Sequence, residues 1–163
     1  MTNATTSSVW RSTGGDSTRT ASAGSMQMSL PFYIANLAAT TNVTASTTSN
    51  SAVILPANAV VTSISITETG TGTIDLGFTP LINVGPGQTT TLGTKIPQGF
   101  LANASTASRV NVQVGGTGGG ASLGNVANAT NLTVVVSTAN TGASGNASGI
   151  ITYFVSTNES EDV

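Results

Sequence analysis

Glu68 and Asp75 are the two acidic side chains in the central part of the chain, on either side of Gly70-Thr71-Gly72. A turn at these glycines would bring the two carboxyl groups together. Two carboxyl groups across a cleft can hydrolyse a glycosidic bond, and carboxylate oxygens are also ligands for Ca²⁺. Asp75, however, has the opposite parity from Ile74 and Leu76, which predicts that it faces solvent. We therefore expect a structural or idle role for the pair, and we expect that replacing both residues by Asn leaves folding and the response to calcium unchanged.

Other residues that could do chemistry are few. The chain contains no His and no Cys, so the commonest general base and the soft metal ligands are missing. Ser is abundant, but a Ser nucleophile without a neighbouring base is inert. Lys95 precedes Ile96-Pro97 in an expected turn and is predicted to be a solvated surface lysine. The glycine run 115–120 lacks the Gly-Lys-Ser/Thr ending of a phosphate-binding loop, and no helix is expected after it. We predict no catalytic residue, no metal and no cofactor, and therefore a protein that is not an enzyme.

The chain is long enough for a single core and is almost uncharged. Of its 163 residues 38% are hydrophobic and only 6% are charged, and the net charge is −2. A typical soluble domain carries about 25% charged residues, so we expect a surface of hydroxyl and amide groups instead. There is no cluster of Lys and Arg of the kind that binds phosphates, and no apolar run of membrane-spanning length. We predict one folded domain with neither nucleic acid nor membrane as partner.

The N-terminal residues 1–24 are rich in Ser, Thr, Gly and Ala and show no periodicity. They are either a flexible arm or an arm that becomes ordered on a partner. In the second case Trp10 would be the anchor, with Arg11 and Arg19 as polar contacts, because Trp and Arg are enriched at binding hot spots. These three side chains are the predicted partner-contact residues. No basic segment followed by an apolar one, as in a secretory signal, occurs here, which indicates synthesis in the cytoplasm.

The alternation of apolar and polar residues predicts strands and no helix. The segments 60–67 and 74–78 both show a period of two, which is typical of half-buried strands. In the first segment Val60, Ile64 and Ile66 share the parity that is expected to face the core. Because only a Gly-rich turn separates the two segments, they are predicted to pair as a β-hairpin.

The rest of the domain is predicted to contain further short strands and Gly-rich loops. Segment 150–155 is apolar on both parities, which is typical of a strand covered on both faces or buried in an oligomer interface. Ile96 and Phe100, in an expected turn at 95–100, are predicted to pack onto the core. The other expected strands are 53–55, ending at Pro56; 26–34, interrupted at Pro31; 109–114; and 132–136, and the expected loops are 80–88 and 138–149.

Eight or nine short strands separated by Gly, Asn, Ser and Thr turns predict an antiparallel β-sandwich, of which the jelly roll is one form. The predicted organisation is an N-terminal arm over 1–24, a β-sandwich domain over 25–157 and a short acidic tail over 158–163.

An apolar-Pro-Ala-x-Ala-Val run precedes a strand and a Gly/Thr-rich turn, and two apolar strands close the chain around a Gly/Ala/Asn loop. This pattern resembles that of head decoration (cement) proteins of tailed phages, in outline over residues 50–156. The resemblance implies a β-sandwich that trimerises on the outer capsid surface, binds the major capsid protein and ties neighbouring capsomers together, and it implies no functional residues. The segments are Leu55-Pro56-Ala57-Asn58-Ala59-Val60-Val61, Ser63-Ile64-Ser65-Ile66, Ile74-Asp75-Leu76-Gly77, Leu132-Thr133-Val134-Val135-Val136 and Ile150-Ile151-Thr152-Tyr153-Phe154.

The expected function is therefore that of a non-enzymatic virion protein, made in the host cytoplasm and placed on the outer surface of a phage capsid, which it stabilises. Two alternatives remain open. A receptor-binding module of a phage tail or fibre would use loops 80–88 and 138–149 to contact a host glycan. A fragment of a bacterial surface adhesin would need an export signal upstream of this sequence.

Overall fold

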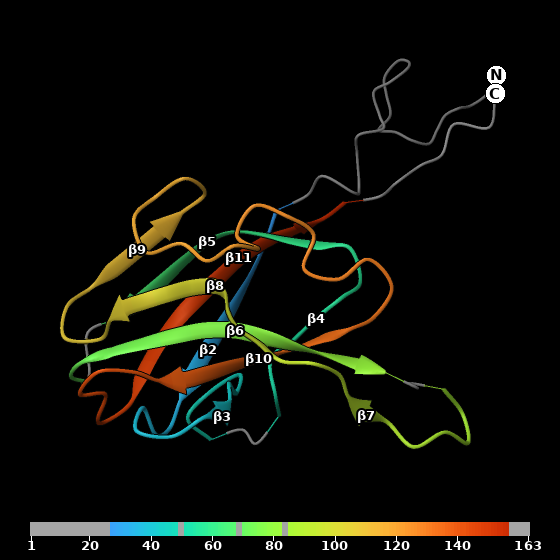
Figure 1. The fold of residues 1–163 in the computed structure, drawn as a ribbon, viewed down its shortest axis with the longest axis horizontal. Coiled ribbons are helices and arrows are strands. Elements are labelled where there is room, and N and C mark those ends of the chain that lie inside the picture. The colour runs from blue at the N-terminus through green and yellow to red at the C-terminus, as the bar shows by residue number, and fades with distance from the viewer. Residues whose placement is uncertain (1–26, 49–50, 68–69, 83–84, 157–163) are drawn as a thin grey trace, which may run out of the picture.

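The computed structural model describes residues 27–48, 51–67, 70–82 and 85–156, and over these residues the protein is an antiparallel β-sandwich without helices (Figure 1). The predicted fold class is confirmed. In the described part of the chain there is accordingly no apolar helix of membrane-spanning length. The strands are β2 (Met28–Ile34), β3 (Thr41–Asn42), β4 (Ile54–Leu55), β5 (Ala59–Thr67), β6 (Thr73–Ile82), β7 (Thr91–Leu92), β8 (Ile96–Ser105), β9 (Val110–Gln113), β10 (Thr133–Ala139) and β11 (Ala147–Val155).

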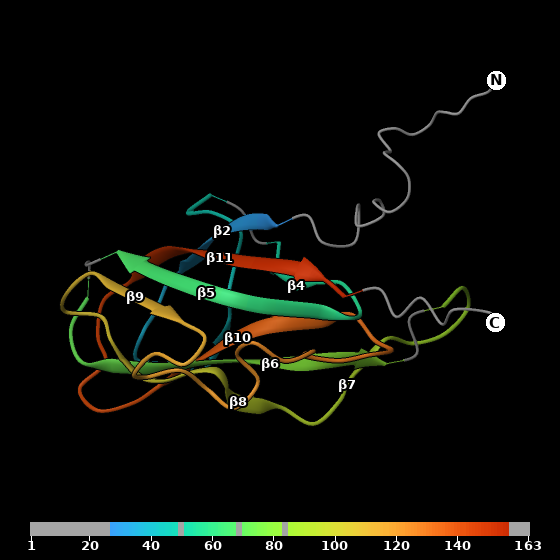
Figure 2. The same ribbon diagram turned by 90° about the horizontal axis from the view of Figure 1, so that it is seen from above.

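The strands form two sheets that face each other across one core (Figure 2). The four-stranded sheet has the order β2-β11-β5-β9. In the six-stranded sheet the order is β3-β10-β6-β7, with β4 also paired to β10 and β8 also paired to β6. The segment that leads into the short strand β7 projects beyond the rest of the sandwich (Figure 1).

The core lies between the sheets and is built from aliphatic side chains around three phenylalanines. Phe32 from the four-stranded sheet and Phe78 and Phe100 from the other are all buried. The rings of Phe78 and Phe100 pack at a centroid distance of 4.9 Å, and burying one such side chain stabilises the fold by roughly 1.5–3 kcal/mol. Core side chains alternate with outward ones along β6, since Ile74, Leu76 and Phe78 belong to the core cluster.

The predicted β-hairpin between segments 60–67 and 74–78 is wrong. β5 pairs with β11 and β9, whereas β6 pairs with β10, β7 and β8, so the connection between them crosses from one sheet to the other. Each of the two strands buries one apolar face. The alternation of apolar and polar residues that results is the same for two strands paired in one sheet and for two strands that face each other across a core. The turn glycine Gly72 has a positive φ of 78°, and its backbone approaches Gly142 of the β10–β11 connection.

A β-bulge in β5 corrects the predicted core face of this strand. The register with β11 shifts between Thr152 and Tyr153, so that Ser63 faces Thr152 while Val61 faces Tyr153. The extra residue changes the parity. Val61, Ile64 and Ile66 therefore point into the core cluster, and Val60, predicted to accompany them, lies outside it.

Three predicted loop or turn regions contain strand residues, and in the loop at 138–149 these are the end of β10 and the start of β11. The expected turn at 95–100 is part of the ten-residue strand β8, and β6 continues to Ile82 within the expected loop at 80–88. Pro97 and Gly99 indicated a turn, and they are accommodated because the β6–β8 register is irregular around them. Phe100 is buried as expected, but Ile96 is 41% exposed, contrary to the prediction.

The closing strand β11 is central in its sheet, but its outer face is only partly covered by the described part of the chain. Ile151 and Tyr153 are buried, whereas Ile150 is 46% exposed. Among the described residues, coverage on both faces, one of the two predicted interpretations of this doubly apolar strand, is therefore incomplete at Ile150. β2 runs without a break through Pro31, which is tolerated because β2 is an edge strand.

Candidate functional site

Asp75 is the one carboxylate among the described residues, and the structure buries it. Its side chain is only 6% exposed. Oδ1 accepts a hydrogen bond from the backbone N–H of Asn103 at 2.8 Å and one from Nδ2 of Asn140 at 3.2 Å, and Oδ2 accepts one from Nε2 of Gln98 at 3.0 Å. Nδ2 of Asn140 also donates to Oδ1 of Asn103 at 2.6 Å, which closes the network.

This network overturns the prediction that Asp75 faces solvent. Asp75 does point away from the core, on the opposite face from Ile74 and Leu76, as its parity predicts. This outer face is nevertheless covered at Asp75 by β8 and by the residues after β10. Three N–H donors converge on the carboxylate, an arrangement that suits an anion and opposes a cation. The described residues include no group of three or more potential metal ligands. Asp75 thus holds β6, β8 and the β10–β11 connection together.

The remaining predicted candidates are distributed as follows. Glu68 and the predicted partner-contact residues Trp10, Arg11 and Arg19 lie outside the described residues. Lys95 is exposed just before β8, as expected of a surface lysine. None of these side chains is brought together with another by the described structure.

The glycine run 115–120 packs its backbone against β8. Gly118 O accepts a hydrogen bond from Ala102 N at 2.9 Å, and Gly120 N donates to Phe100 O at 2.9 Å. A Cβ on Gly120 would lie 2.0 Å from Gln98 O, so glycine is needed for this close approach. The run therefore covers a sheet edge.

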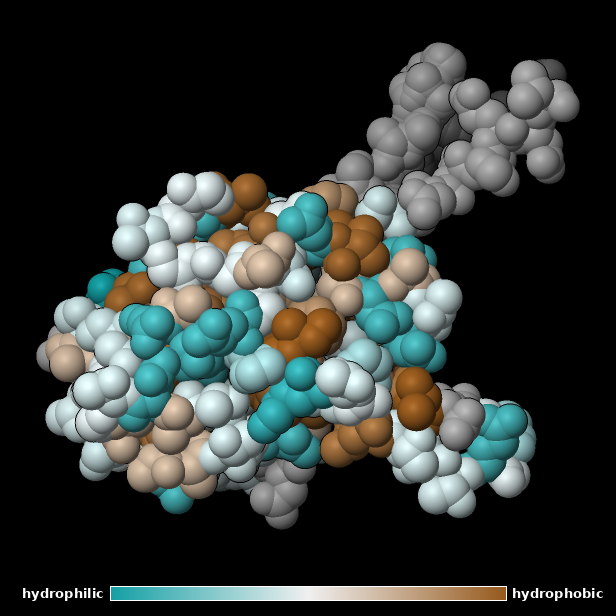
Figure 3. All heavy atoms as spheres, in the orientation of Figure 1, coloured by the Kyte–Doolittle hydropathy of each residue, from teal (hydrophilic) through white to brown (hydrophobic). Residues whose placement is uncertain are grey.

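An apolar strip crosses the outer face of the six-stranded sheet near β7 and consists of Ile54, Leu81, Leu92 and Leu132. Leu81 is paired with Leu92, and its N–H donates to Leu132 O at 2.8 Å; Ile54 is paired with Val134, two residues after Leu132. Cross-strand partners share a face. Leu92 is 60% exposed, and Ile54 and Leu132 are also exposed. Figure 3, which views this sheet face-on, shows hydrophobic patches among hydroxylated and amide side chains.

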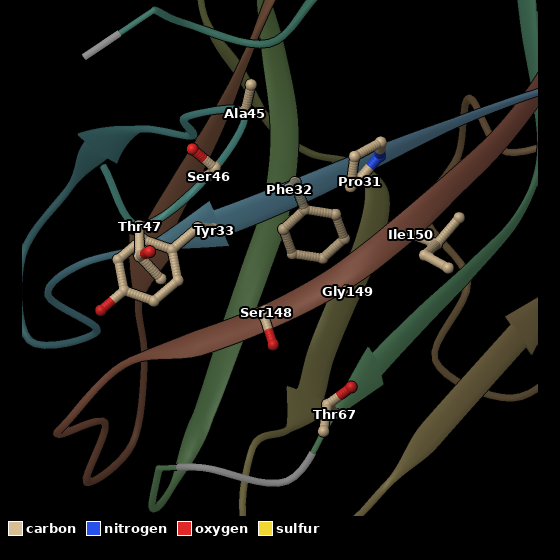
Figure 4. A pocket seen from close by; sticks show the side chains of 10 residues that line it. All are labelled: Pro31, Phe32, Tyr33, Ala45, Ser46, Thr47, Thr67, Ser148, Gly149 and Ile150. Carbon is tan, nitrogen blue, oxygen red and sulfur yellow. The ribbon is translucent and has the colours of Figure 1, made fainter. Parts of the chain in front are cut away.

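A shallow cavity of about 370 Å³ lies on the opposite side of the molecule, on the outer face of the four-stranded sheet (Figure 4). Its floor is formed by β2 and β11, one wall by residues 45–47 between β3 and β4, and another by Thr67 at the end of β5. The lining residues are Pro31, Phe32, Tyr33, Ala45, Ser46, Thr47, Thr67, Ser148, Gly149 and Ile150. No motif in the sequence indicated this cavity, because it depends on the pairing of β2 with the last strand.

Comparisons with protein-family models, with curated proteins and with solved structures find no significant match to this chain.

Proposed function

We propose that this chain is a non-enzymatic virion structural protein that decorates a phage capsid and stabilises it by bridging capsomers. The observation that carries the proposal is the apolar strip, which lies on a β-sandwich whose described surface is rich in hydroxyl and amide groups and has few charged side chains. The charged side chains of the described residues are the buried Asp75 and the exposed Lys95 and Arg109. Such a surface adheres through shape and apolar contact and steers ligands weakly.

The strand pairing supports a jelly-roll fold, which we infer from the order of the pairs. β3 and β4 pair with the same strand and act as one interrupted strand, and β7 is an appendage of β6. Then the first strand pairs with the last, the second with the second last, and so on inward: β2 with β11, β3 and β4 with β10, β5 with β9, and β6 with β8. A long hairpin rolled into two sheets has these pairs, and jelly rolls are common in viral capsid proteins and in lectins. The fold alone does not decide between these functions.

The apolar strip is proposed to join copies of the chain into a trimer. Interfaces within homo-oligomers are more apolar than those of transient complexes, and the projecting segment that leads into β7 places Leu92 where a neighbouring copy can reach it. The N-terminal arm, with Trp10, Arg11 and Arg19, is proposed to contact the major capsid protein.

Replacing Leu92 with Ser is expected to dissociate the trimer. Leu92 is 60% exposed within one chain, so the substitution should leave the fold intact, while loss of a central apolar contact costs roughly 1–2 kcal/mol or more per interface. In analytical ultracentrifugation the unsubstituted protein should sediment as a trimer. The concentration below which L92S dissociates into monomers should be about tenfold higher than that of the unsubstituted protein. Val114→Ser is the matched control, because Val114 is 56% exposed and adjoins β9 in the other sheet. A monomeric unsubstituted protein, or an L92S trimer of unchanged stability, would contradict the assignment of the strip.

Binding to assembled shells tests the function itself. We expect the full chain to co-sediment with capsids that lack it and to raise their resistance to heat, since a protein that binds only the assembled shell stabilises it by mass action over many sites. Removal of residues 1–24 is expected to reduce this binding at least tenfold. Shell binding that is unchanged without these residues would remove the arm from the proposal, and failure of the full chain to bind would refute the proposed function.

A further inference from the structure

We propose that the cavity on the four-stranded sheet is a binding site for a neutral carbohydrate, independently of whether the chain decorates a capsid. The lining residues contain no charged side chain. They combine three apolar or aromatic groups, Pro31, Tyr33 and Ile150, with several hydroxyl groups. A neutral sugar offers the matching chemistry, because its C–H faces pack on apolar groups while its hydroxyls both donate and accept hydrogen bonds.

The strand register arranges the polar groups in a row. Tyr33 is directly opposite Ser148, and Ser148 is directly opposite Thr67 on its other side. Neighbouring strands lie about 4.8 Å apart, so the three hydroxyl-bearing side chains stand side by side across β2, β11 and β5. The residues two positions further along these strands, which lie on the same face, are Pro31, Ile150 and Ser65. Pro31 and Ile150 therefore form an apolar surface next to the polar row.

Several of these hydroxyl groups are available to a ligand. Within the described residues, the hydroxyls of Tyr33, Thr47 and Ser148 make no hydrogen bond to another residue, whereas Thr44 Oγ1, beside the cavity, donates to the backbone carbonyl of Tyr33 at 3.2 Å. Figure 4 shows the Tyr33 ring next to Thr47 at one end of the cavity and Ile150 at the other. A hydroxyl can donate one hydrogen bond and accept two, so this row can match the hydroxyls of a sugar in more than one orientation.

The shape sets the kind of ligand. The volume of about 370 Å³ is at the small end of the roughly 300–1,000 Å³ of known ligand sites. The cavity is open to solvent, so a ligand longer than one sugar ring can extend out of it. These features favour a short internal segment of a neutral polysaccharide over an enclosed monosaccharide. The predicted glycan-contact loops 80–88 and 138–149 overlap this site only at Ser148 and Gly149.

Affinity electrophoresis of the full chain in gels that contain dextran, amylose, xylan, mannan or galactan tests the site, with alginate as an acidic comparison. We expect at least one neutral polymer to retard the protein. Tyr33→Ala should weaken that retardation at least tenfold, and Ser148→Tyr, which fills the cavity from an outward-facing position, should abolish it. Thr91→Ala, which removes an exposed hydroxyl from β7 in the six-stranded sheet, should have no effect, and thermal melting confirms that each variant is folded.

Tyr33→Phe separates the two contributions of the ring, because it keeps the apolar surface and removes the hydroxyl. We expect partial loss, about threefold, at unchanged melting temperature. Absence of retardation by every neutral polymer, retardation by alginate alone, or retardation that Y33A and S148Y leave unchanged would each overturn the proposal.

Discussion

Replacing Gly77 with alanine is expected to destabilise the sandwich by about 3 kcal/mol or more, at the upper end of what overpacking costs. Gly77 is buried in β6, and the backbone of Ile96 and Pro97 at the start of β8 approaches it closely. An added Cβ would lie 1.8 Å from Ile96 O and 2.6 Å from two backbone atoms of Pro97. Backbone atoms cannot rotate away, so β8 must move from β6 and the packing of Phe78 against Phe100 must loosen.

Thermal and urea unfolding measure this effect. For a chain of this size a loss of 3 kcal/mol lowers the melting temperature by roughly 6–12 °C. Gly85→Ala is the matched control, because its Cβ would meet only the Gln88 side chain, at 3.4 Å. The free energy of unfolding of G85A should stay within about 0.5 kcal/mol of that of the unsubstituted protein. Equal stability of G77A and G85A would mean that the backbone of Ile96 and Pro97 does not approach Gly77 as described.

Replacing Asp75 with alanine is expected to cost about 3 kcal/mol, since hydrogen bonds to a charged group contribute roughly 1.5–3 kcal/mol and unpaired buried groups add to the loss. The carboxylate accepts the Asn103 N–H, and Asn103 has a positive φ of 53°. Without that acceptor, nothing compensates for this backbone conformation. Removing a buried charge also relieves a desolvation cost, but three donors then lose their partner, and the loss outweighs the relief.

Graded variants distinguish this network from a metal site. Asp75→Asn keeps one carbonyl acceptor, so its free energy of unfolding should lie between those of the unsubstituted protein and D75A. Gln98→Ala removes a single donor from an exposed side chain and should lower the free energy of unfolding by less than about 1 kcal/mol. Added CaCl₂ should leave the melting temperature of the unsubstituted protein unchanged. A rise in melting temperature with calcium that D75N abolishes would contradict the network. The structure thus reverses the expectation that Asn at this position is harmless.

The elements that local alternation defines well could be predicted from the sequence. Residues 133–136 of the predicted strand 132–136 lie in β10, residues 150–155 lie in β11, and 109–114 contains β9. Pro56 ends β4 as expected, and Asn58 takes the positive φ of the turn that follows. In these segments the local pattern and the tertiary environment require the same conformation.

The pairing partners could not be predicted, because alternation indicates which face is buried and not what lies beside the strand. For this reason the turn at Gly70 to Gly72 was interpreted as a hairpin when it is a crossing between sheets. The bulge at Thr62 and the covering of Asp75 by β8 likewise depend on residues distant in the sequence. The cavity beside Tyr33 exists only because β2 pairs with β11, the last strand of the chain.

The most direct test of the proposed function is an electron cryo-microscopy reconstruction of the phage particle that contains this chain. We expect density for the β-sandwich on the outer surface of the shell, repeated at sites between capsomers, with the apolar strip of Ile54, Leu81, Leu92 and Leu132 facing neighbouring copies. Density confined to the tail or fibres, or a particle from which the chain is absent, would contradict the assignment to the capsid.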